Sequence, residues 1–435
     1  MAEDALGNPL TAASSAEIDA FVSAFLAYDA RASEVVGAAG RHPASAMLNA
    51  YAGLLWLLLE APVGPVRAAP FLARARSVAA GARERLWAEA LTVWSEGDAA
   101  EAQRRFEAIV VAFPSDLPAA KVSQYLSFNV GDADAMLRVA RSAVAPDDPH
   151  LLAMLAFAYE ESYRLAEAEA AARRALSLEP SEPWAQHALA HVMLTEGRVA
   201  EGVDFLEGAR DGWVDLNSFM VTHLWWHLAL FYLSQGRFDD ALAAYDEQVW
   251  GVDKAYSQDQ VGAVSLLARI ELAGAKAGDR WVDLAGHLAA RGPDVTLPFL
   301  TAQYLYGLAR ADRLEADSLM SAVRAAPGED WRAVATPLCE GLLAHARGDM
   351  TGARAALEAA LPGLSRIGGS HAQRDLFEQV WLDSVIRLED WPAAREALEA
   401  RRRFDPGGVP LNRALARVRG ALGLVGGVNG TDTHP

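Results

Sequence analysis

The chain has 435 residues, of which 52% are hydrophobic and 22% are charged, and its formal net charge is −18. Nucleic-acid binding depends on basic patches that displace counterions, and no such patch stands out, so we expect no nucleic-acid partner. Ala, Leu, Glu and Arg are abundant and runs of β-branched residues are scarce, which favours helices almost throughout.

The single cysteine, Cys339, excludes a disulfide within the chain, so a bound metal would need histidine and carboxylate ligands. The N-terminal sequence MAEDALGNPL lacks the basic and apolar pattern of a secretion signal. The apolar run from Leu54 to Leu59 is too short to cross a bilayer. We therefore expect a cytoplasmic protein without membrane contact.

Three regions are predicted in chain order. Residues 1–80 are expected to form two or three N-terminal capping helices, because a solenoid must cover its terminal apolar face. The most apolar stretch of this region is RHPASAMLNAYAGLLWLLLEAPVGP. Residues 81–403 are expected to form a tetratricopeptide-repeat solenoid, and residues 404–435 a C-terminal helix with the flexible tail GLVGGVNGTDTHP.

The repeat region is indicated by small residues that recur twelve positions apart. Two helices of a hairpin cross closely only where both present small side chains, so each pair marks one hairpin. The pairs are Ala90 and Ala102, Ala156 and Ala168, Ala190 and Gly202, Ala229 and Ala241, and Gly341 and Ala353. The pattern predicts an all-α tetratricopeptide-repeat solenoid of about eight to ten helix pairs, curled around a central groove or pocket.

Four of the ten histidines form two pairs on consecutive predicted repeats: His187 and His191, then His223 and His227. Helical geometry places both pairs in the same half-turn as three residues of the preceding repeat: His150, Glu160 and Glu161. First helices of neighbouring repeats line the concave surface about 8–10 Å apart. We therefore expect all seven side chains to line one wall of the groove and to contact a ligand.

Three interpretations of the histidines stay open. The four paired rings, His187, His191, His223 and His227, would suit a divalent transition metal. If the groove carries out proton transfer, His191 and His227 are the preferred catalytic residues. Alternatively, the rings are hydrogen-bonded packing residues. Of the adjacent tryptophans, Trp226 is expected to face the groove and its ligand, and Trp225 to pack.

The segment RIGGSHAQRDLFEQVWLDSVIR predicts a helix that begins with a capping box of Ser370 and Gln373 after two glycines. Its first turn is unusually polar, with His371, Gln373, Arg374 and Asp375. We expect these side chains to face the cavity from the C-terminal half and to bind a ligand, with Arg374 assisting an anion at the helix N-terminus. The alternative is a capped helix end that faces water.

Four segments resemble the tetratricopeptide repeat protein 38 family, and the resemblance extends over nearly the whole chain. The most specific are WAQHALAHVMLTEGR, HLWWHLALFYLSQGRFDDALAAYD and GGSHAQRDLFEQ, supported by LAFAYEESYRLAEAEAAARRAL. The resemblance implies an all-helical tetratricopeptide fold, but no established general activity.

No Ser, Cys or Lys motif indicates a nucleophile, and the histidine pairs lack the His-Glu-x-x-His spacing of zinc proteases. The leading interpretation is a groove that binds a small molecule or short peptide, with enzymatic activity left open. The alternative is a non-catalytic scaffold for a protein partner. Scaffold grooves that grip a peptide carboxylate offer Lys, Arg and Asn, whereas this predicted wall offers His, Trp and Glu.

Overall fold

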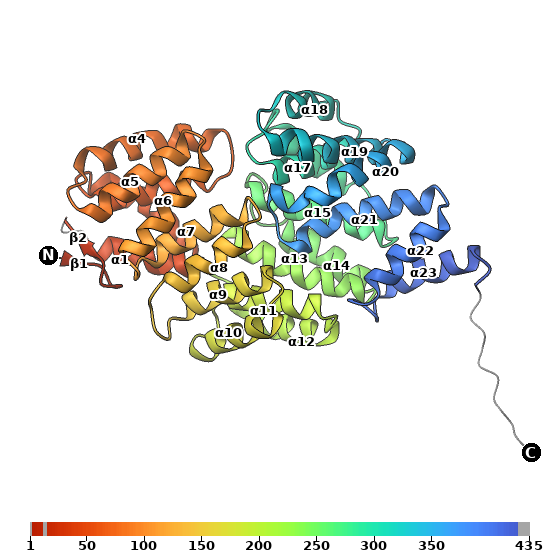
Figure 1. Cartoon of the computed structure of the whole chain (residues 1–435), viewed down its shortest axis with the longest axis horizontal. Helices are drawn as coiled ribbons and strands as arrows, with labels where there is room; N and C mark the ends of the chain where they lie inside the picture. Colours follow the sequence, from red (N-terminus) through yellow and green to blue (C-terminus); the bar gives the residue numbers. More distant parts are fainter. Residues whose placement is uncertain (1, 12–14, 425–435) are drawn as a thin grey trace, which may run out of the picture.

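The computed structural model describes residues 2–11 and 15–424, which form a solenoid of antiparallel helix pairs (Figure 1). The predicted fold class, an all-α tetratricopeptide-type solenoid, is confirmed. Two short strands, β1 (Ala2–Glu3) and β2 (Pro9–Leu10), pair antiparallel near the N-terminus. The last part of the predicted flexible tail, 425–435, lies outside the described residues.

The N-terminal region contains more helices than the two or three expected. It consists of α1 (Ser15–Leu26), the 3-10 helix η1 (Ala30–Glu34), α2 (Val35–Arg41), α3 (Ala46–Leu57) and α4 (Val63–Val78). The apolar capping helix is α3, whose N-terminus is capped by Ser45. Beyond the C-terminus of α3, Glu60 has a φ of 53° and Pro62 begins the turn into α4. The predicted apolar stretch is therefore divided between α3 and the start of α4. The division of the chain at residues 80 and 403 stays a prediction.

Helix pairs follow where the sequence predicts repeats. The helices are α5 (Ala82–Ser95), α6 (Ala99–Ala112), α7 (Leu117–Phe128), α8 (Ala133–Ser142), α9 (Pro149–Glu161), α10 (Leu165–Leu178), α11 (Pro183–Thr195), α12 (Val199–Ala209), α13 (Ser218–Ser234), α14 (Phe238–Ala244), α15 (Ser257–Leu272), α16 (Arg280–Ala289), α17 (Pro298–Arg310), α18 (Glu315–Ala325), α19 (Thr336–Ala346), α20 (Met350–Ala360), α21 (His371–Arg387), α22 (Trp391–Arg401) and α23 (Val409–Ala421). Shorter turns are the 3-10 helices η2 (Arg210–Gly212) and η5 (Leu361–Ile367) and the π-helices η3 (Tyr245–Val249) and η4 (Trp331–Ala335).

The predicted small residues lie at the buried helix crossings. Ala190 of α11 is fully buried, and an added Cβ on Gly202 of α12 would lie 2.3 Å from the ring of Phe231 on α13. The turn between α11 and α12 contains Gly197 with a φ of 69°, which an L side chain rarely adopts. Glycine therefore permits both the tight turn and the close helix packing that place α11 beside α13.

The N-terminal region closes onto the middle of the solenoid. The Ala30 N–H donates to the Asp215 carbonyl at 3.0 Å, and the Asn217 N–H donates to the Tyr28 carbonyl at 2.7 Å. The Ser257 hydroxyl at the start of α15 donates to the Leu59 carbonyl at 2.6 Å. The segment 210–217, between α12 and α13, therefore forms part of the contact that closes the solenoid.

The C-terminal half also folds back toward the same place, and α21 lies beside α15 (Figure 1). Arg269 of α15 donates to the Ala372 carbonyl at 2.6 Å. Gly368, with a φ of 84°, lies so close to the backbone of Asn129 that an added Cβ would come within 2.9 Å of its carbonyl oxygen. These contacts hold the start of α21 against α7 and α15.

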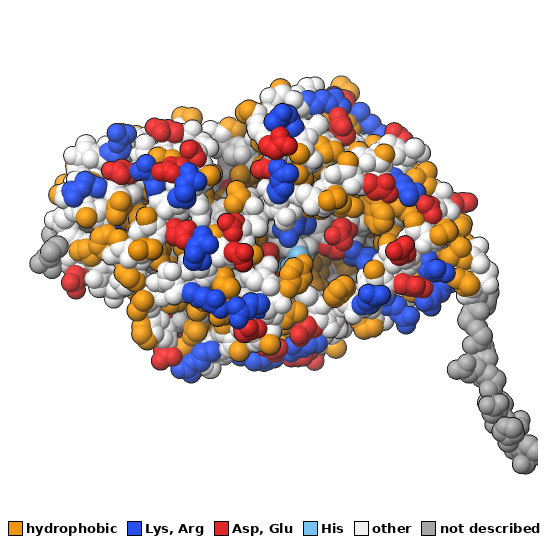
Figure 2. Space-filling model, viewed as in Figure 1, with side chains coloured by type: hydrophobic (Ala, Val, Ile, Leu, Met, Phe, Trp, Pro, Cys, Tyr) orange, Lys and Arg blue, Asp and Glu red, His pale blue; other side chains and the backbone are white. Residues whose placement is uncertain are grey.

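On the face shown in Figure 2, acidic and basic side chains are interspersed, and apolar side chains are scattered among them. In the part of the chain that the structure describes, none of the helices combines the length and hydropathy needed to cross a bilayer.

Candidate functional site

A cavity of about 460 Å³ lies where the N-terminal region, the middle repeats and the start of α21 meet. Its lining is mainly apolar and includes the rings of Tyr28, Trp56, Phe128, Phe157, Trp184 and Phe219. Gly369, Ser370 and Gln373 border it from the C-terminal half. The predicted GGSHAQRD segment thus contributes to the wall of a cavity built mainly by other repeats.

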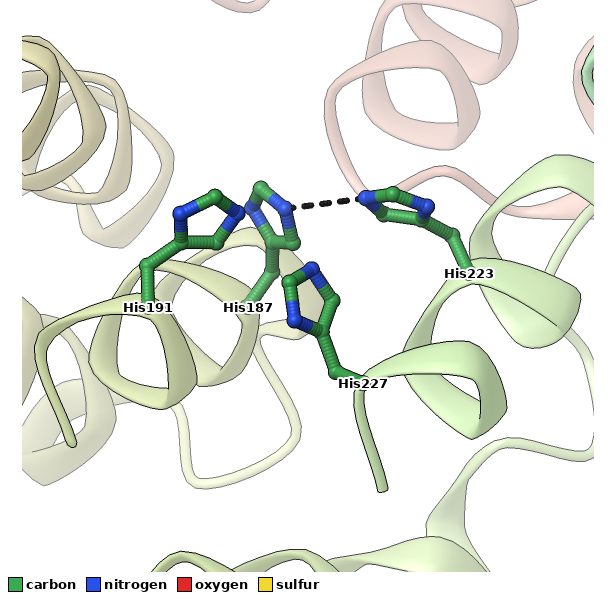
Figure 3. A group of neighbouring side chains, drawn as sticks. All are labelled: His187, His191, His223 and His227. Carbon is green, nitrogen blue, oxygen red and sulfur yellow. Dashed lines mark hydrogen bonds between the residues drawn. The ribbon is translucent and has the colours of Figure 1, made fainter. Parts of the chain in front are cut away.

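The two histidine pairs form one cluster, which we call the histidine tetrad: His187, His191, His223 and His227. Each pair lies one turn apart on one helix, and α11 and α13 place the pairs face to face (Figure 3). One nitrogen from each of the four rings lies within 4.8 Å of the others. The Nε2 atoms of His187 and His223 are 3.1 Å apart.

The tetrad extends from the cavity wall into the interior. His187 and His223 border the cavity, whereas His191 and His227 are fully buried behind them. Burial lowers the pKa of His187 and His227 well below the usual range, and it lowers the pKa of His223 to about 3. These three rings are therefore neutral near pH 7, the protonation state in which imidazole binds metals.

The tetrad contains buried ring nitrogens that lack hydrogen bonds. Within residues 2–11 and 15–424, no hydrogen-bond partner is found for Nδ1 of His187, Nε2 of His191 or either ring nitrogen of His227, whereas Nδ1 of His191 lies 3.3 Å from Oε2 of Glu160. A buried polar atom without a partner costs roughly 1–3 kcal/mol, and four of them lie in one cluster. Hydrogen bonding within the described residues accounts for the Nε2 atoms of His187 and His223 but not for these four nitrogens.

An acidic group adjoins the tetrad at His191. Glu160 and Glu161, at the C-terminal end of α9, lie with His191 and His371 so that one ligand atom of each falls within the same 4.8 Å limit. Oε1 of Glu160 lies 3.2 Å from Nε2 of His371, and its Oε2 lies 3.3 Å from Nδ1 of His191. Thr195 also hydrogen-bonds to Nε2 of His371 at 2.9 Å.

Opposite charges stabilise this acidic group. Although burial favours the neutral acid, His191 and His371 lower the pKa of Glu160. Although burial favours the neutral ring, Glu160 and Glu161 raise the pKa of His371 to about 8. Near neutral pH His371 is therefore a cation held beside a carboxylate, in contrast to the neutral rings of His187, His223 and His227.

Aromatic rings surround the tetrad. Trp184 stacks on His187 with ring centroids 4.2 Å apart, and it borders the cavity. Trp226 stacks on His223 with ring centroids 5.3 Å apart, and it is buried rather than part of the cavity wall; the Arg269 guanidinium lies 5.3 Å from its ring centroid. The expectation that Trp226 faces the groove is wrong, and Trp225 packs on Trp213 as expected.

Two other predicted site residues lie away from the tetrad. His150 sits in the first turn of α9, where its Nδ1 is 3.2 Å from Glu182. Ten residues separate it from Glu160, about 15 Å along the helix axis, so α9 brings Glu160 and Glu161 to the tetrad but not His150. Asp375 is held by Arg401 at 2.6 Å, and this ion pair lowers the pKa of Asp375 to about 2 despite burial.

The remaining residues of the α21 N-terminus have local partners. Ser370 and Gln373 form the predicted capping box, with Ser370 accepting from the Gln373 N–H at 3.2 Å. Arg374 donates to the Gly369 carbonyl within its own segment, and its expected role in binding an anion stays a prediction. Of the four polar side chains predicted there, His371 joins the acidic group and Gln373 borders the cavity.

Sequence reasoning missed the N-terminal wall of the cavity. Tyr28, Trp56 and Lys121 border it, although the first eighty residues were expected only to cap the solenoid. Lys121 donates to the Phe25 carbonyl at 2.6 Å and lies 3.2 Å from the ring centroid of Tyr28. No local motif marks these positions, because they reach the cavity only through contacts between distant segments.

Comparison with known proteins identifies a tetratricopeptide repeat at residues 222–249, which begin in α13 and end in η3. Among solved structures, the chain is similar to one of the APC/C hetero-tetramer Cut9-Hcn1, with TM-score 0.44 and 11% identity; the match covers 82% of this chain and 63% of that one. It is also similar to the human IFIT1 dimer with m7Gppp-AAAA, with TM-score 0.42 and 15% identity, covering 90% and 95% respectively.

Proposed function

We propose that the protein binds a small, largely apolar molecule with a flat ring system in the cavity beside the histidine tetrad. The observation that carries this proposal is the lining: aromatic side chains from several helices surround a space whose polar groups are few and include His187 and His223. Small-molecule sites commonly have volumes of about 300–1,000 Å³ and this mixture of apolar walls with a few polar groups.

A small molecule suits the cavity better than an extended peptide. The N-terminal region and the start of α21 close the space that an open tetratricopeptide groove would offer to a peptide. Lys121 borders the cavity, but two backbone carbonyls, those of Phe25 and Leu26, already accept from its amino group. Scaffold grooves grip a peptide carboxylate with a free cation. None of the side chains that line this cavity in the described residues offers one.

The ligand would meet His187 and His223 first, because these two tetrad residues border the cavity. His191 and His227, preferred from the sequence as catalytic residues, are fully buried behind them. We therefore assign recognition of a polar atom on the ligand to His187 and His223. His191 and His227 support these two rings from behind.

We also infer that the chain is a member of the tetratricopeptide repeat protein 38 family. The segments that carry the resemblance are those that build the site: WAQHALAHVMLTEGR forms α11, HLWWHLALFYLSQGR lies in and just beyond α13, and GGSHAQRDLFEQ begins α21. If so, relatives that keep the same three segments should also bind a small molecule in the corresponding cavity.

Binding of the neutral fluorescent probe N-phenyl-1-naphthylamine tests the proposal. The wild-type chain should bind one equivalent with saturable fluorescence enhancement. Leu55→Trp, at a lining position of α3, should fill the space and weaken probe binding at least tenfold. Val66→Trp, at an exposed position of α4, is the matched control and should bind as the wild type does. Equal binding by both variants, or no saturable binding by the wild type, would favour the protein-partner scaffold instead.

A further inference from the structure

The four rings of the tetrad are spaced as ligands of one metal ion. A tetrahedral ion with metal–nitrogen distances of about 2.0–2.1 Å holds its ligand nitrogens about 3.3 Å from one another. The Nε2 atoms of His187 and His223 are already 3.1 Å apart. All four rings offer a nitrogen within 4.8 Å of the others, so side-chain rotations that close the widest gap by about 1.5 Å complete the set.

The orientation of His191 supports the same interpretation. Its Nδ1 faces Oε2 of Glu160 at 3.3 Å, and its other ring nitrogen points toward His187 (Figure 3). Histidines that bind metals usually present one nitrogen to the ion and direct the other to a carboxylate or carbonyl, which fixes the tautomer and the ring. Glu160 is placed to fix His191 in this way.

The surrounding charge is suitable for a buried cation. Imidazole binds a metal in its neutral form, so a divalent ion would bring two positive charges into the interior. The side chains of Glu160 and Glu161 are buried beside His191: Oε2 of Glu160 lies 3.3 Å from Nδ1 of His191, and Oε1 of Glu161 lies 3.7 Å from Nδ1 of His371. Their negative charge offsets that of the ion. His187 and His223 border the cavity, which provides the path by which the ion enters.

We propose that His187, His191, His223 and His227 bind one divalent transition-metal ion, and that Glu160 is the positioning residue for His191. Imidazole ligands favour zinc, copper, nickel, cobalt or iron over magnesium and calcium. The adjoining group of Glu160, Glu161, His191 and His371 is the rival position for an ion. Nε2 of its His371 is already paired with Glu160 and Thr195, whereas four ring nitrogens of the tetrad have no hydrogen-bond partner within residues 2–11 and 15–424. The tetrad is therefore the favoured site, and it is independent of whether the cavity binds an apolar molecule.

Cobalt provides the direct test on the wild-type protein. Stripped protein titrated with Co²⁺ should take up one equivalent, and the visible ligand-field bands should show nitrogen ligation in a tetrahedral or five-coordinate site. X-ray absorption at the cobalt edge should then show histidine scattering. No uptake, or an ion surrounded only by oxygen atoms, would overturn the proposal without any variant, and probe binding in the cavity could still stand.

Three histidine variants locate the ion. His223→Gln should lower cobalt affinity at least 100-fold, because it removes a ligand at the more accessible edge of the tetrad. His345→Gln is the matched control: His345 is also a buried histidine, hydrogen-bonded to Tyr306 and Asp383, and its loss should leave affinity unchanged. His371→Gln should also leave one equivalent bound. Loss of binding in His371→Gln but not in His223→Gln would place the ion in the acidic group and refute the tetrad site.

The positioning role of Glu160 has its own readout. Glu160→Gln should lower cobalt affinity about 10–100-fold while keeping one equivalent at saturation and the same ligand-field spectrum, as expected for a residue that orients a ligand. A changed spectrum would show that Glu160 itself binds the ion. Unchanged affinity would refute its role. If Glu160→Gln does not fold, Glu160→Asp provides the same comparison with a shorter carboxylate.

Discussion

Glu160 faces two histidines from different parts of the chain: Oε2 lies 3.3 Å from Nδ1 of His191, and Oε1 lies 3.2 Å from Nε2 of His371. His371 comes from α21, in the C-terminal half of the chain, and its pKa is raised to about 8. One buried carboxylate thus joins the histidine tetrad of the middle repeats to the helix that closes the cavity.

We expect Glu160→Ala to lower the free energy of unfolding by roughly 3–5 kcal/mol at pH 7, because removing one partner leaves a buried cation without compensation. Chemical denaturation of metal-free protein measures this. The control is Glu89→Ala, which removes the more exposed partner of Arg105 and should change stability by less than about 1 kcal/mol. Equal effects of the two substitutions would show that the His371 contact contributes little.

Metal should stabilise the protein only through the tetrad. In metal-free protein, His191→Gln and His227→Gln should hold or raise the melting temperature, because each removes a buried ring with at least one nitrogen that lacks a partner in the described residues. Zn²⁺ at 100 times its dissociation constant should raise the free energy of unfolding of the wild type by about 2.7 kcal/mol. The same zinc concentration should not stabilise either variant. A large loss of melting temperature in both variants, with zinc stabilisation intact, would make these histidines packing residues.

Two glycines of α12 should respond to alanine in opposite ways. Gly202→Ala should destabilise by roughly 1–3 kcal/mol, because its Cβ would come within 2.3 Å of the Phe231 ring on α13. Gly208→Ala meets no atom within 4 Å, so the better helix propensity of alanine should stabilise by up to about 1 kcal/mol. Thermal unfolding of both variants checks this. A neutral Gly202→Ala would mean that α12 and α13 pack less closely than described.

Asp259 predicts a pH dependence of stability. Burial first, and then Asp253, raises its pKa to about 7, and Thr222 donates to it at 3.1 Å. Between the unfolded pKa of about 3.9 and pH 7 the folded state holds the extra proton, so the free energy of unfolding falls as pH rises.

Asp259→Asn keeps the oxygen that accepts from Thr222 and removes the titration. Denaturation from about pH 4 to about pH 8 should then show a variant more stable than the wild type at the alkaline end, by up to about 4 kcal/mol. Asp211→Asn, at an exposed position, should follow the wild-type curve. Parallel curves for Asp259→Asn and wild type would show that Asp259 is ionised at neutral pH.

Helical periodicity was sufficient to predict the tetrad, because four-residue spacing on two first helices of adjacent repeats leaves few other arrangements. It failed for Trp226, since eleven of the 17 residues of α13 are buried and the pattern does not distinguish its groove side from its other packed sides. It failed for His150 because an angular sector ignores position along the helix axis. The N-terminal wall of the cavity depends on contacts between Tyr28 and Asn217, which no local pattern encodes.

The contacts of Ala30 with Asp215 and of Ser257 with Leu59 have a consequence for how this architecture changes over evolution. An open solenoid tolerates the gain or loss of a repeat, because each unit touches only its neighbours. Here a duplicated or deleted hairpin between α5 and α12 would shift the two partners of each bond relative to each other by a full repeat, and the bonds could not form. The number of hairpins in that arc is therefore fixed by closure, and we expect variation in chain length to occur at exposed loops or beyond α23.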